Sequence, residues 1–494
     1  MSSDVRPRKT GIIVFSARIL SVFTGSFFLL MLTRSLATTQ FGLWEFITDV
    51  VVFASYPTGL LTYWATREVA RGKVVGKTTL VLNLLASTIG MGIFLAFALL
   101  SYSSIHQELT PFLFSLVLVP LSYWNQATLA LVGGYNPAIG AYSLLVSEPA
   151  KLIVAFPLLF VFNLGIYGVI VAIAVSFLVQ NVAATVQLSK VTTDKVDLSL
   201  GKKWLSQPHV PALAGLVAAM GVADTFAASI GQGSTLLAGY YQAAFQVATL
   251  VGYSLYLSSA LYPLLLRRSE TEPSDLFKTS LEFTLLFAVP MAAGSIALAS
   301  KILYLLSPRY VVSATALIIL SLAAVSSSIS WVVDQGLMGR ETADIEEGNR
   351  TKRILSSDLA FVSLANLAYS AVYVSSVFVI GRFTPVTASG IGRFVDYWAT
   401  SQLVFNAVLV AGKSLRLARR MKVRISRSIL SYIGAGTAMG VLVYLLSASL
   451  LPTTLTNLDF SLRLGGLVGI GAVFYFGLLL LADEDVRAMA RTIL

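Results

Sequence analysis

Charged side chains interrupt several of the long apolar runs in this chain. Three pairs are three or four residues apart, and each pair therefore lies on one face of a helix: Glu45 with Asp49, Glu148 with Lys151, and Arg393 with Asp396. Two interpretations stay open for Glu148 with Lys151 and for Arg393 with Asp396. They either form structural ion pairs or contact a charged substrate or a coupling ion.

A single arginine lies in the middle of the first apolar run, "GIIVFSARILSVFTGSFFLLMLT", residues 11–33. A guanidinium at the centre of a bilayer costs at least about 2.5 kcal/mol, so Arg18 should face protein or a watery cavity. Its own helix offers no acid within four residues. Arg18 therefore either pairs with Asp49 or Glu45 on the next span or binds a phosphate, for which its planar fork is well suited. Both alternatives stay open.

The composition indicates a protein that crosses the membrane many times. The chain is 56% hydrophobic and 12% charged, with a mean hydropathy of +0.79, which lies outside the range of soluble globular domains. It contains no cysteine, which excludes disulfides and thiolate chemistry. His106 and His209 are too far apart in the sequence to suggest a metal cluster.

Hydropathy predicts fourteen membrane-spanning helices. Their expected ranges are 11–33, 41–65, 80–102, 111–133, 140–162, 165–188, 209–231, 239–266, 279–306, 313–338, 358–380, 388–412, 428–450 and 462–481. Most of the lysines and arginines fall in the N-terminus, the loops after even-numbered spans and the C-terminal tail; the alternate loops hold Arg34, Lys301, Arg309, Arg382 and Arg463. The positive-inside rule then predicts that both termini are cytoplasmic. The net charge of +11 is mostly loop charge and is not a sign of nucleic-acid binding.

Short internal repeats indicate two related halves. "FGLWEFITD" at 41–49 aligns with "AGYYQAAFQ" at 238–246, and "KTTLVLNLL" at 77–85 aligns with "KTSLEFTLL" at 278–286. We therefore expect a six-span lobe at 1–195, a second at 206–413 and two further spans within 428–482. Because six is even, the lobes share one orientation and are related by a pseudo-twofold axis along the membrane normal. The substrate site is expected between them.

Two polar segments could in principle bind phosphate groups, of lipids or of nucleotides. "KSLRLARRMKVRISR" at 413–427 has seven positive and no negative side chains, so we expect it on the anionic leaflet, as a topology anchor or a lipid-headgroup site. "GKVVGKT" at 72–78 imitates a phosphate-binding loop but has three residues between its glycines where four are required. Asp334 is expected at the cytoplasmic interface, near the end of its span.

Several stretches resemble the polysaccharide flippases of the multidrug/oligosaccharidyl-lipid/polysaccharide exporter (MOP) superfamily. They are "FSARIL", "TRSLATTQFGLWEFI", "AGYYQAAFQ", "SALYPLLLRRSE" and "VPMAAGSIALASKILYLLSPRY". The likeness follows nearly the whole chain in order. It implies two six-helix bundles around a V-shaped cavity, which alternates between the two sides of the membrane and carries a lipid-linked sugar to the outer face. Arg18 matches in position a basic residue on the first helix of the related lipid II flippases, where the cavity binds the diphosphate-sugar headgroup.

A cavity that handles sugars needs amides for hydrogen bonds and flat rings for stacking. The candidate substrate-binding residues are Arg18, Lys151, Arg393, Tyr123, Trp124, Asn125, Gln242 and Gln246, and the same spans also carry Gln126, Tyr240, Tyr241, Gln402 and Asn406. Aromatic residues also form belts at membrane interfaces, an alternative that stays open for Tyr240 and Tyr241. The candidate coupling or ion-pair residues are Glu45, Asp49, Glu148, Asp224 and Asp396.

The acids in the spans outnumber the basic residues there, which keeps a second function open. An antiporter of organic cations would use Asp224 or Asp49 to couple export to Na⁺ or H⁺. A membrane glycosyltransferase is disfavoured because the expected outer loops are short and "SSIHQELT" is their only acidic stretch before Asp459.

The sequence thus predicts an all-α flippase of the cell membrane that catalyses no reaction and has no cofactor beyond a coupling ion, Na⁺ or H⁺. Its substrate is expected to be an oligosaccharide on a polyprenyl phosphate or diphosphate, and its partners membrane lipids and glycan-assembly enzymes. Nucleic acid is not expected as a partner.

Overall fold

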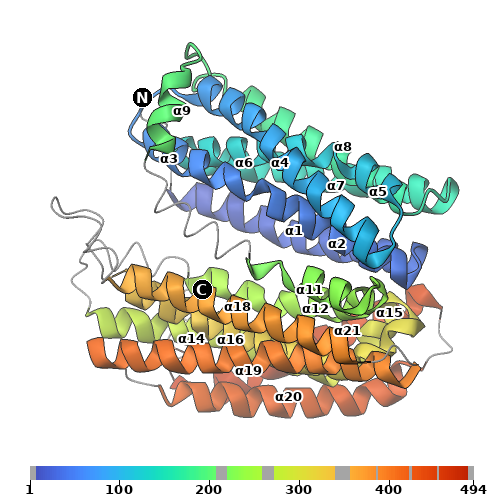
Figure 1. Cartoon of the computed structure of the whole chain (residues 1–494). Helices are drawn as coiled ribbons and strands as arrows, with labels where there is room; N and C mark the ends of the chain where they lie inside the picture. The colour runs from blue at the N-terminus through green and yellow to red at the C-terminus, as the bar shows by residue number, and fades with distance from the viewer. Residues whose placement is uncertain are drawn as a thin grey trace. The chain divides into compact units, whose positions relative to one another are not determined.

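The computed structural model describes residues 7–206, 220–258, 272–339, 357–384, 388–421, 426–452, 456–484 and 486–487. Within these ranges every regular element is a helix (Figure 1), which confirms the prediction of an all-α membrane protein. Counting only described residues, nine helices are long and apolar enough to cross a membrane. The other predicted spans coincide with helices that are shorter, carry more charge or continue outside the described ranges.

Two compact units are distinguished by their internal packing. The first comprises Met1–Gly239 with Gly381–Phe383, and the second comprises Tyr240–Ile380 with Thr384–Leu494. The boundary at residue 239 differs from the linker at 195–206 that the repeat favours, so α11 (Asp224–Gln232) lies with the first unit. The lobe boundaries derived from the repeat stay a prediction.

The first unit holds the helices that correspond to the first six predicted spans, together with α9, which lies between the predicted spans 165–188 and 209–231. They are α1 (Pro7–Ser35), α2 (Thr38–Ser55), η1 (Tyr56–Thr58), α3 (Gly59–Ala70), α4 (Gly76–Ile105), α5 (Leu109–Ser115), α6 (Leu118–Tyr135), α7 (Pro137–Phe156), η2 (Pro157–Val161), α8 (Ile166–Gln187) and α9 (Leu198–Leu205). The predicted span 41–65 is broken into α2, η1 and α3. Pro57 lies at the start of η1, and because proline lacks the N–H that a continuous helix requires, the chain tightens there into a short 3₁₀ turn.

The second unit contains the helices of the predicted spans from 239–266 onward, while α11, the helix of the span 209–231, lies in the first unit. The helices of the second unit are α12 (Leu236–Gly252), which begins in the first unit, then η3 (Tyr253–Ser258), α14 (Pro273–Ala297), α15 (Ala299–Leu306), η4 (Pro308–Ser313), α16 (Ala314–Met338), α18 (Asp358–Phe383), α19 (Ala388–Arg420), α20 (Ser428–Leu450) and α21 (Asn457–Ala482). The predicted span 209–231 is described only from residue 220 onward, and 239–266 only as far as residue 258.

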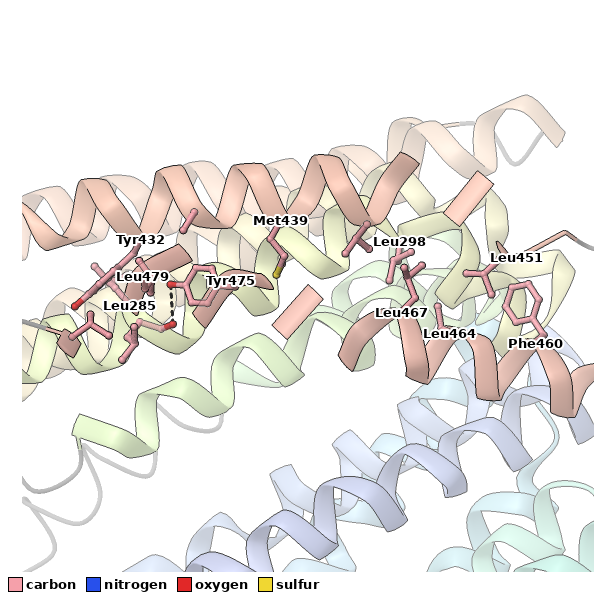
Figure 2. Close-up of a cluster of buried hydrophobic side chains, with 14 residues drawn as sticks. Leu285, Leu298, Tyr432, Met439, Leu451, Phe460, Leu464, Leu467, Tyr475 and Leu479 are labelled. Carbon is pink, nitrogen blue, oxygen red and sulfur yellow. Dashed lines mark hydrogen bonds between the residues drawn. The ribbon is translucent and has the colours of Figure 1, made fainter. Parts of the chain in front are cut away.

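The last two helices are held to the rest of the second unit by a buried apolar cluster. Leu285 on α14, Met439 on α20 and Leu467 on α21 are among its members (Figure 2). The hydroxyl of Tyr475 donates to the carbonyl of Leu286 over 3.0 Å, so this buried phenol is satisfied. The cluster makes α20 and α21 an integral part of this unit.

The segment between α8 and α9 is held against the N-terminus of α4 by hydrogen bonds. The Asp194 carboxylate accepts the N–H groups of Lys77 (2.7 Å) and Thr78 (2.8 Å) and the Thr78 hydroxyl (2.7 Å), at the N-terminus of α4. Asp197 caps α9, and hydrogen bonds from Ser199 lower the pKa of its carboxyl. A carboxylate therefore occupies the place where "GKVVGKT" would have to hold a phosphate.

We expect Asp194→Ala to lower the free energy of unfolding by about 0.5–2 kcal/mol, the cost of removing a helix cap. Detergent-to-SDS titration of the purified protein, followed by circular dichroism, measures this. Glu484→Ala is the control, since that side chain is 92% exposed and its nearest pairing distance to Arg487 is 3.9 Å. Equal midpoints for the two variants would contradict a capping role.

Candidate functional site

Three carboxylates approach one another in the first unit. Glu45 and Asp49 lie one turn apart on α2, and Asp224 begins α11. Glu45 and Asp224 are buried and Asp49 is half-buried. Asp49 takes a hydrogen bond from the Thr225 side chain and is near enough to Asp224 and Glu45 to be repelled by both. Carboxylates that repel one another in this way attract a proton or a cation, which relieves the repulsion.

These carboxylates do not form a ready-made metal site. Among the residues that the structure describes, no three histidines, aspartates or glutamates are placed to hold a metal ion together. The Asp224 carboxylate accepts the N–H of Thr225 over 2.9 Å, which orients it at the start of α11.

Glu148 and Lys151 form the ion pair that their spacing predicts. The Lys151 ammonium lies 2.8 Å from the Glu148 carboxylate, and each side chain is 11% exposed. Helix α1 completes this site: Thr24 donates to Glu148 over 2.5 Å, and the Phe28 ring centroid is 5.2 Å from the ammonium. The pair is therefore satisfied within α1 and α7. Contact of either residue with a substrate stays a prediction.

A groove of about 500 Å³ opens beside the break between α2 and α3. Its wall is formed by the end of α2, by η1 and α3, and by α6. Most of the polar side chains that line it carry hydroxyls, and none is charged. The lining residues are Val52, Ser55, Tyr56, Thr58, Gly59, Thr62, Tyr63, Thr66, Gln126, Leu129 and Ala130.

Three of the four residues in the segment 123–126 of α6 form hydrogen bonds within the protein. Tyr123 is fully buried and donates to the carbonyl of Ala54 over 2.8 Å. Trp124 donates to the Thr185 hydroxyl over 3.1 Å. Asn125 donates to the side chain of Asn181 over 3.0 Å. The next residue, Gln126, is exposed and lines the groove.

In the second unit, an aromatic stack fixes the start of α12. Tyr241 lies parallel to Trp398 with ring centroids 3.7 Å apart, and its hydroxyl donates to Gln402 over 2.7 Å. Trp398 in turn donates to the Tyr373 hydroxyl over 2.9 Å.

Among the other candidate amides, Gln242 is buried and Gln246 half-buried, both on α12. Asn406 on α19 accepts from Ser326 over 3.1 Å. Tyr240 is half-buried, and its ring packs edge-on to Tyr310 with centroids 5.9 Å apart.

Arg393 and Asp396 do not form the ion pair that was one expectation for them. Arg393 is exposed on α19. Asp396 is half-buried and accepts a hydrogen bond from the backbone of Ala316, in the first turn of α16. Because this turn has unpaired N–H groups, Asp396 supports a helix end.

The most complete buried ionic cluster of the described residues is one that sequence reasoning missed. Lys413 on α19 is 1% exposed, and its ammonium lies 2.8 Å from Asp334 on α16. It also donates to Asn366 on α18 over 2.7 Å and to Ser330 over 3.0 Å. Three helices thus share one buried cation.

One expectation at the end of α19 is therefore wrong, because Lys413 is buried in the protein and does not lie on the leaflet surface. Asp334 is buried as well, and its expected position at the membrane interface stays a prediction. Arg416 pairs with Asp358 over 2.7 Å and lies over the Phe361 ring. The helix continues to Arg420, so the first part of the basic segment packs against the unit. No spacing along the chain could have indicated partners on other helices.

Arg18 lies within α1, but its side chain is outside the described residues. Both alternatives for Arg18, an ion pair with Asp49 or Glu45 on α2 and the binding of a phosphate, stay predictions.

Comparison with known proteins identifies the fold. No protein-family model matches the chain, and no curated protein matches it. A structure of the lipid II flippase MurJ in an inward closed conformation matches with a TM-score of 0.64 at 14% identity, covering 96% of this chain and 99% of that one. An inward-facing multidrug resistance MATE family transporter of the MOP superfamily matches with a TM-score of 0.59 at 14% identity, covering 83% and 99%.

A MOP superfamily transporter from Pyrococcus furiosus gives a TM-score of 0.54 at 14% identity, with 83% and 94% covered. The chain therefore has the fold of MOP superfamily transporters. These structural neighbours are transporters and flippases, not enzymes.

Proposed function

We propose that the protein is a flippase that moves an oligosaccharide linked to a polyprenyl phosphate or diphosphate from the cytoplasmic to the outer leaflet of the cell membrane. It works by alternating access with both termini in the cytoplasm. The observation that carries this proposal is the extent of the match to the lipid II flippase, which covers 96% of this chain, whereas the MATE transporter covers 83%.

Transport of such a headgroup needs a cation for its phosphates and a source of energy. Arg18 is proposed to bind a phosphate, for which a guanidinium offers two parallel N–H donors. Lys151 and Arg393 are the other candidate cations. Coupling to Na⁺ or H⁺ is assigned to the carboxylates near Asp49, since a proton or cation there would relieve their mutual repulsion.

The carboxylates of Glu45, Asp49 and Asp224 favour a second candidate, an antiporter that exports organic cations. A cation could exchange with Na⁺ or H⁺ at these acids. The structural match to a multidrug resistance MATE family transporter supports this alternative at the level of the fold.

One preparation in sealed vesicles tests both candidates. A polyprenyl-diphosphate oligosaccharide in the inner leaflet is followed by its exposure to an external sugar-binding protein, and efflux of a fluorescent organic cation is measured in parallel. The flippase proposal predicts sugar exposure that exceeds that of protein-free vesicles. Cation efflux driven by Na⁺ or H⁺ without sugar exposure would overturn it in favour of the antiporter.

We expect Arg18→Ala to abolish flipping while leaving the protein folded, because the phosphate loses its bidentate donor. Arg18→Lys keeps the charge without the planar fork and should retain part of the activity. Arg71→Ala is the control, since this exposed residue lies just after α3. Flipping by Arg18→Ala at the wild-type rate would exclude the headgroup role.

A further inference from the structure

We propose that the groove between α3 and α6 is a subsite for a neutral sugar of the transported headgroup. This inference rests on the proposed flippase function and names what one part of the site recognises. Three properties of the lining residues support it: their hydrogen-bonding groups, their aromatic rings and their lack of charge.

The groove offers unused donors beside hydroxyl acceptors. Within the described chain, neither the Gln126 amide nor the Tyr56 hydroxyl forms a hydrogen bond, and both line the groove. Thr62 donates to the carbonyl of Thr58 (3.1 Å), and Thr66 donates to that of Ala130 (3.1 Å). Each threonine oxygen therefore keeps lone pairs with which to accept from a ligand. Such a mixture suits a polyol, whose hydroxyls both donate and accept.

Aromatic rings supply the second feature of a sugar site. Tyr56 and Tyr63 both line the groove. Tyr63 is fixed by the Arg67 guanidinium, 4.4 Å from its ring centroid, and by an edge contact with Trp64 at 5.1 Å. A ring held in this way offers an amphipathic surface at little entropic cost.

The lining contains no charged side chain. Neither a phosphate nor an organic cation would find an opposite charge among these lining side chains, and an unpaired charge in a partly desolvated site is costly. The carboxylate of Asp49 is close enough to interact electrostatically with Tyr56, but Asp49 is not one of the residues that line the groove. At about 500 Å³ the groove lies within the range of small-ligand pockets. A neutral sugar ring is the part of the proposed substrate that fits these properties.

The test measures binding to the full-length protein in detergent by native mass spectrometry. The two probes are a C55 polyprenyl diphosphate that carries one N-acetylhexosamine and the same lipid without sugar. Gln126→Leu and Thr62→Val each remove one hydrogen-bonding group, and the double variant should bind the sugar-bearing lipid at least tenfold more weakly while binding the bare lipid like the wild type. Thr88→Val is the matched control, because Thr88 is an exposed threonine of α4 whose hydroxyl donates to its own helix.

The outcomes separate this inference from the proposed function. Unchanged affinity of the double variant for the sugar-bearing lipid overturns the subsite, even if the protein flips that lipid. Equal losses for both lipids also overturn it, because the defect is then not specific to sugar. Gln126→Asn keeps the amide and provides a milder variant if the double variant fails to fold; its loss should again be confined to the sugar-bearing lipid. A wild type that neither binds nor flips the sugar-bearing lipid contradicts the flippase function itself.

Discussion

Lys413→Ala is expected to lower the free energy of unfolding by about 3–5 kcal/mol, the range for breaking a buried ion pair on one side. The substitution leaves the Asp334 carboxylate buried without its cation, since Lys413 is 1% exposed and Asp334 is buried. It also removes the donor to Asn366 and Ser330. The effect should appear as a lower midpoint on titration from detergent into SDS.

A double variant without either charge shows how much of the lost stability comes from the unpaired Asp334 carboxylate and how much from the missing ion pair itself. The double variant Lys413→Met with Asp334→Leu fills a similar volume with apolar groups and should recover most of the loss, because replacing both partners of a buried pair is often close to neutral. Lys203→Ala is the matched control. Lys203 is an exposed lysine of α9, so its replacement should change the free energy of unfolding by less than about 0.5 kcal/mol. A Lys413→Ala variant as stable as Lys203→Ala would contradict the assignment.

The helices could be predicted from the sequence because hydropathy is a property of consecutive residues. Each predicted span is mostly helical where the chain is described, with short breaks at 116–117, 222–223 and 298. The pairing of Glu148 with Lys151 could be predicted for a similar reason, since the helix repeat brings residues three apart to one face. Arg393 and Asp396 have the same spacing, but Asp396 instead accepts a hydrogen bond at the N-terminus of α16. Local spacing allows a pair, and neighbouring helices decide whether it forms.

The rest of the candidate site depends on contacts between helices that are far apart in the sequence, and these contacts cannot be predicted from local spacing. Lys413 finds its partners on α16 and α18. The rotation of α6 decides that Tyr123 is buried while Gln126 lines the groove. Pro57 lies at the break between α2 and α3, but the groove exists only because α6 lies beside that break. Such features require the packed structure.

The second large effect is expected at Gly42 in the first unit. A Cβ on Gly42 would lie 2.0 Å from the Thr235 carbonyl oxygen and 2.7 Å from the Gly239 nitrogen. A Cβ on Gly239 would lie 2.2 Å from the carbonyl oxygen of Thr38. These neighbours are backbone atoms, which cannot rotate aside as a side chain can. The two glycines hold the same position in the aligned segments "FGLWEFITD" and "AGYYQAAFQ".

We therefore expect Gly42→Ala to cost at least the about 1–3 kcal/mol typical of overpacking, because α2 must move away from residues 235–239. Gly25→Ala is the control: nothing lies within 4 Å of its Cβ position on α1, and alanine is the better helix former by about 0.5–1 kcal/mol. The SDS-titration midpoint should fall for Gly42→Ala and hold or rise for Gly25→Ala. Gly239→Ala added to Gly42→Ala should cost less than it does alone, since both disturb one contact and the first has already separated the backbones. Fully additive losses, or a Gly42→Ala variant of wild-type stability, would show that the two glycines do not share this contact.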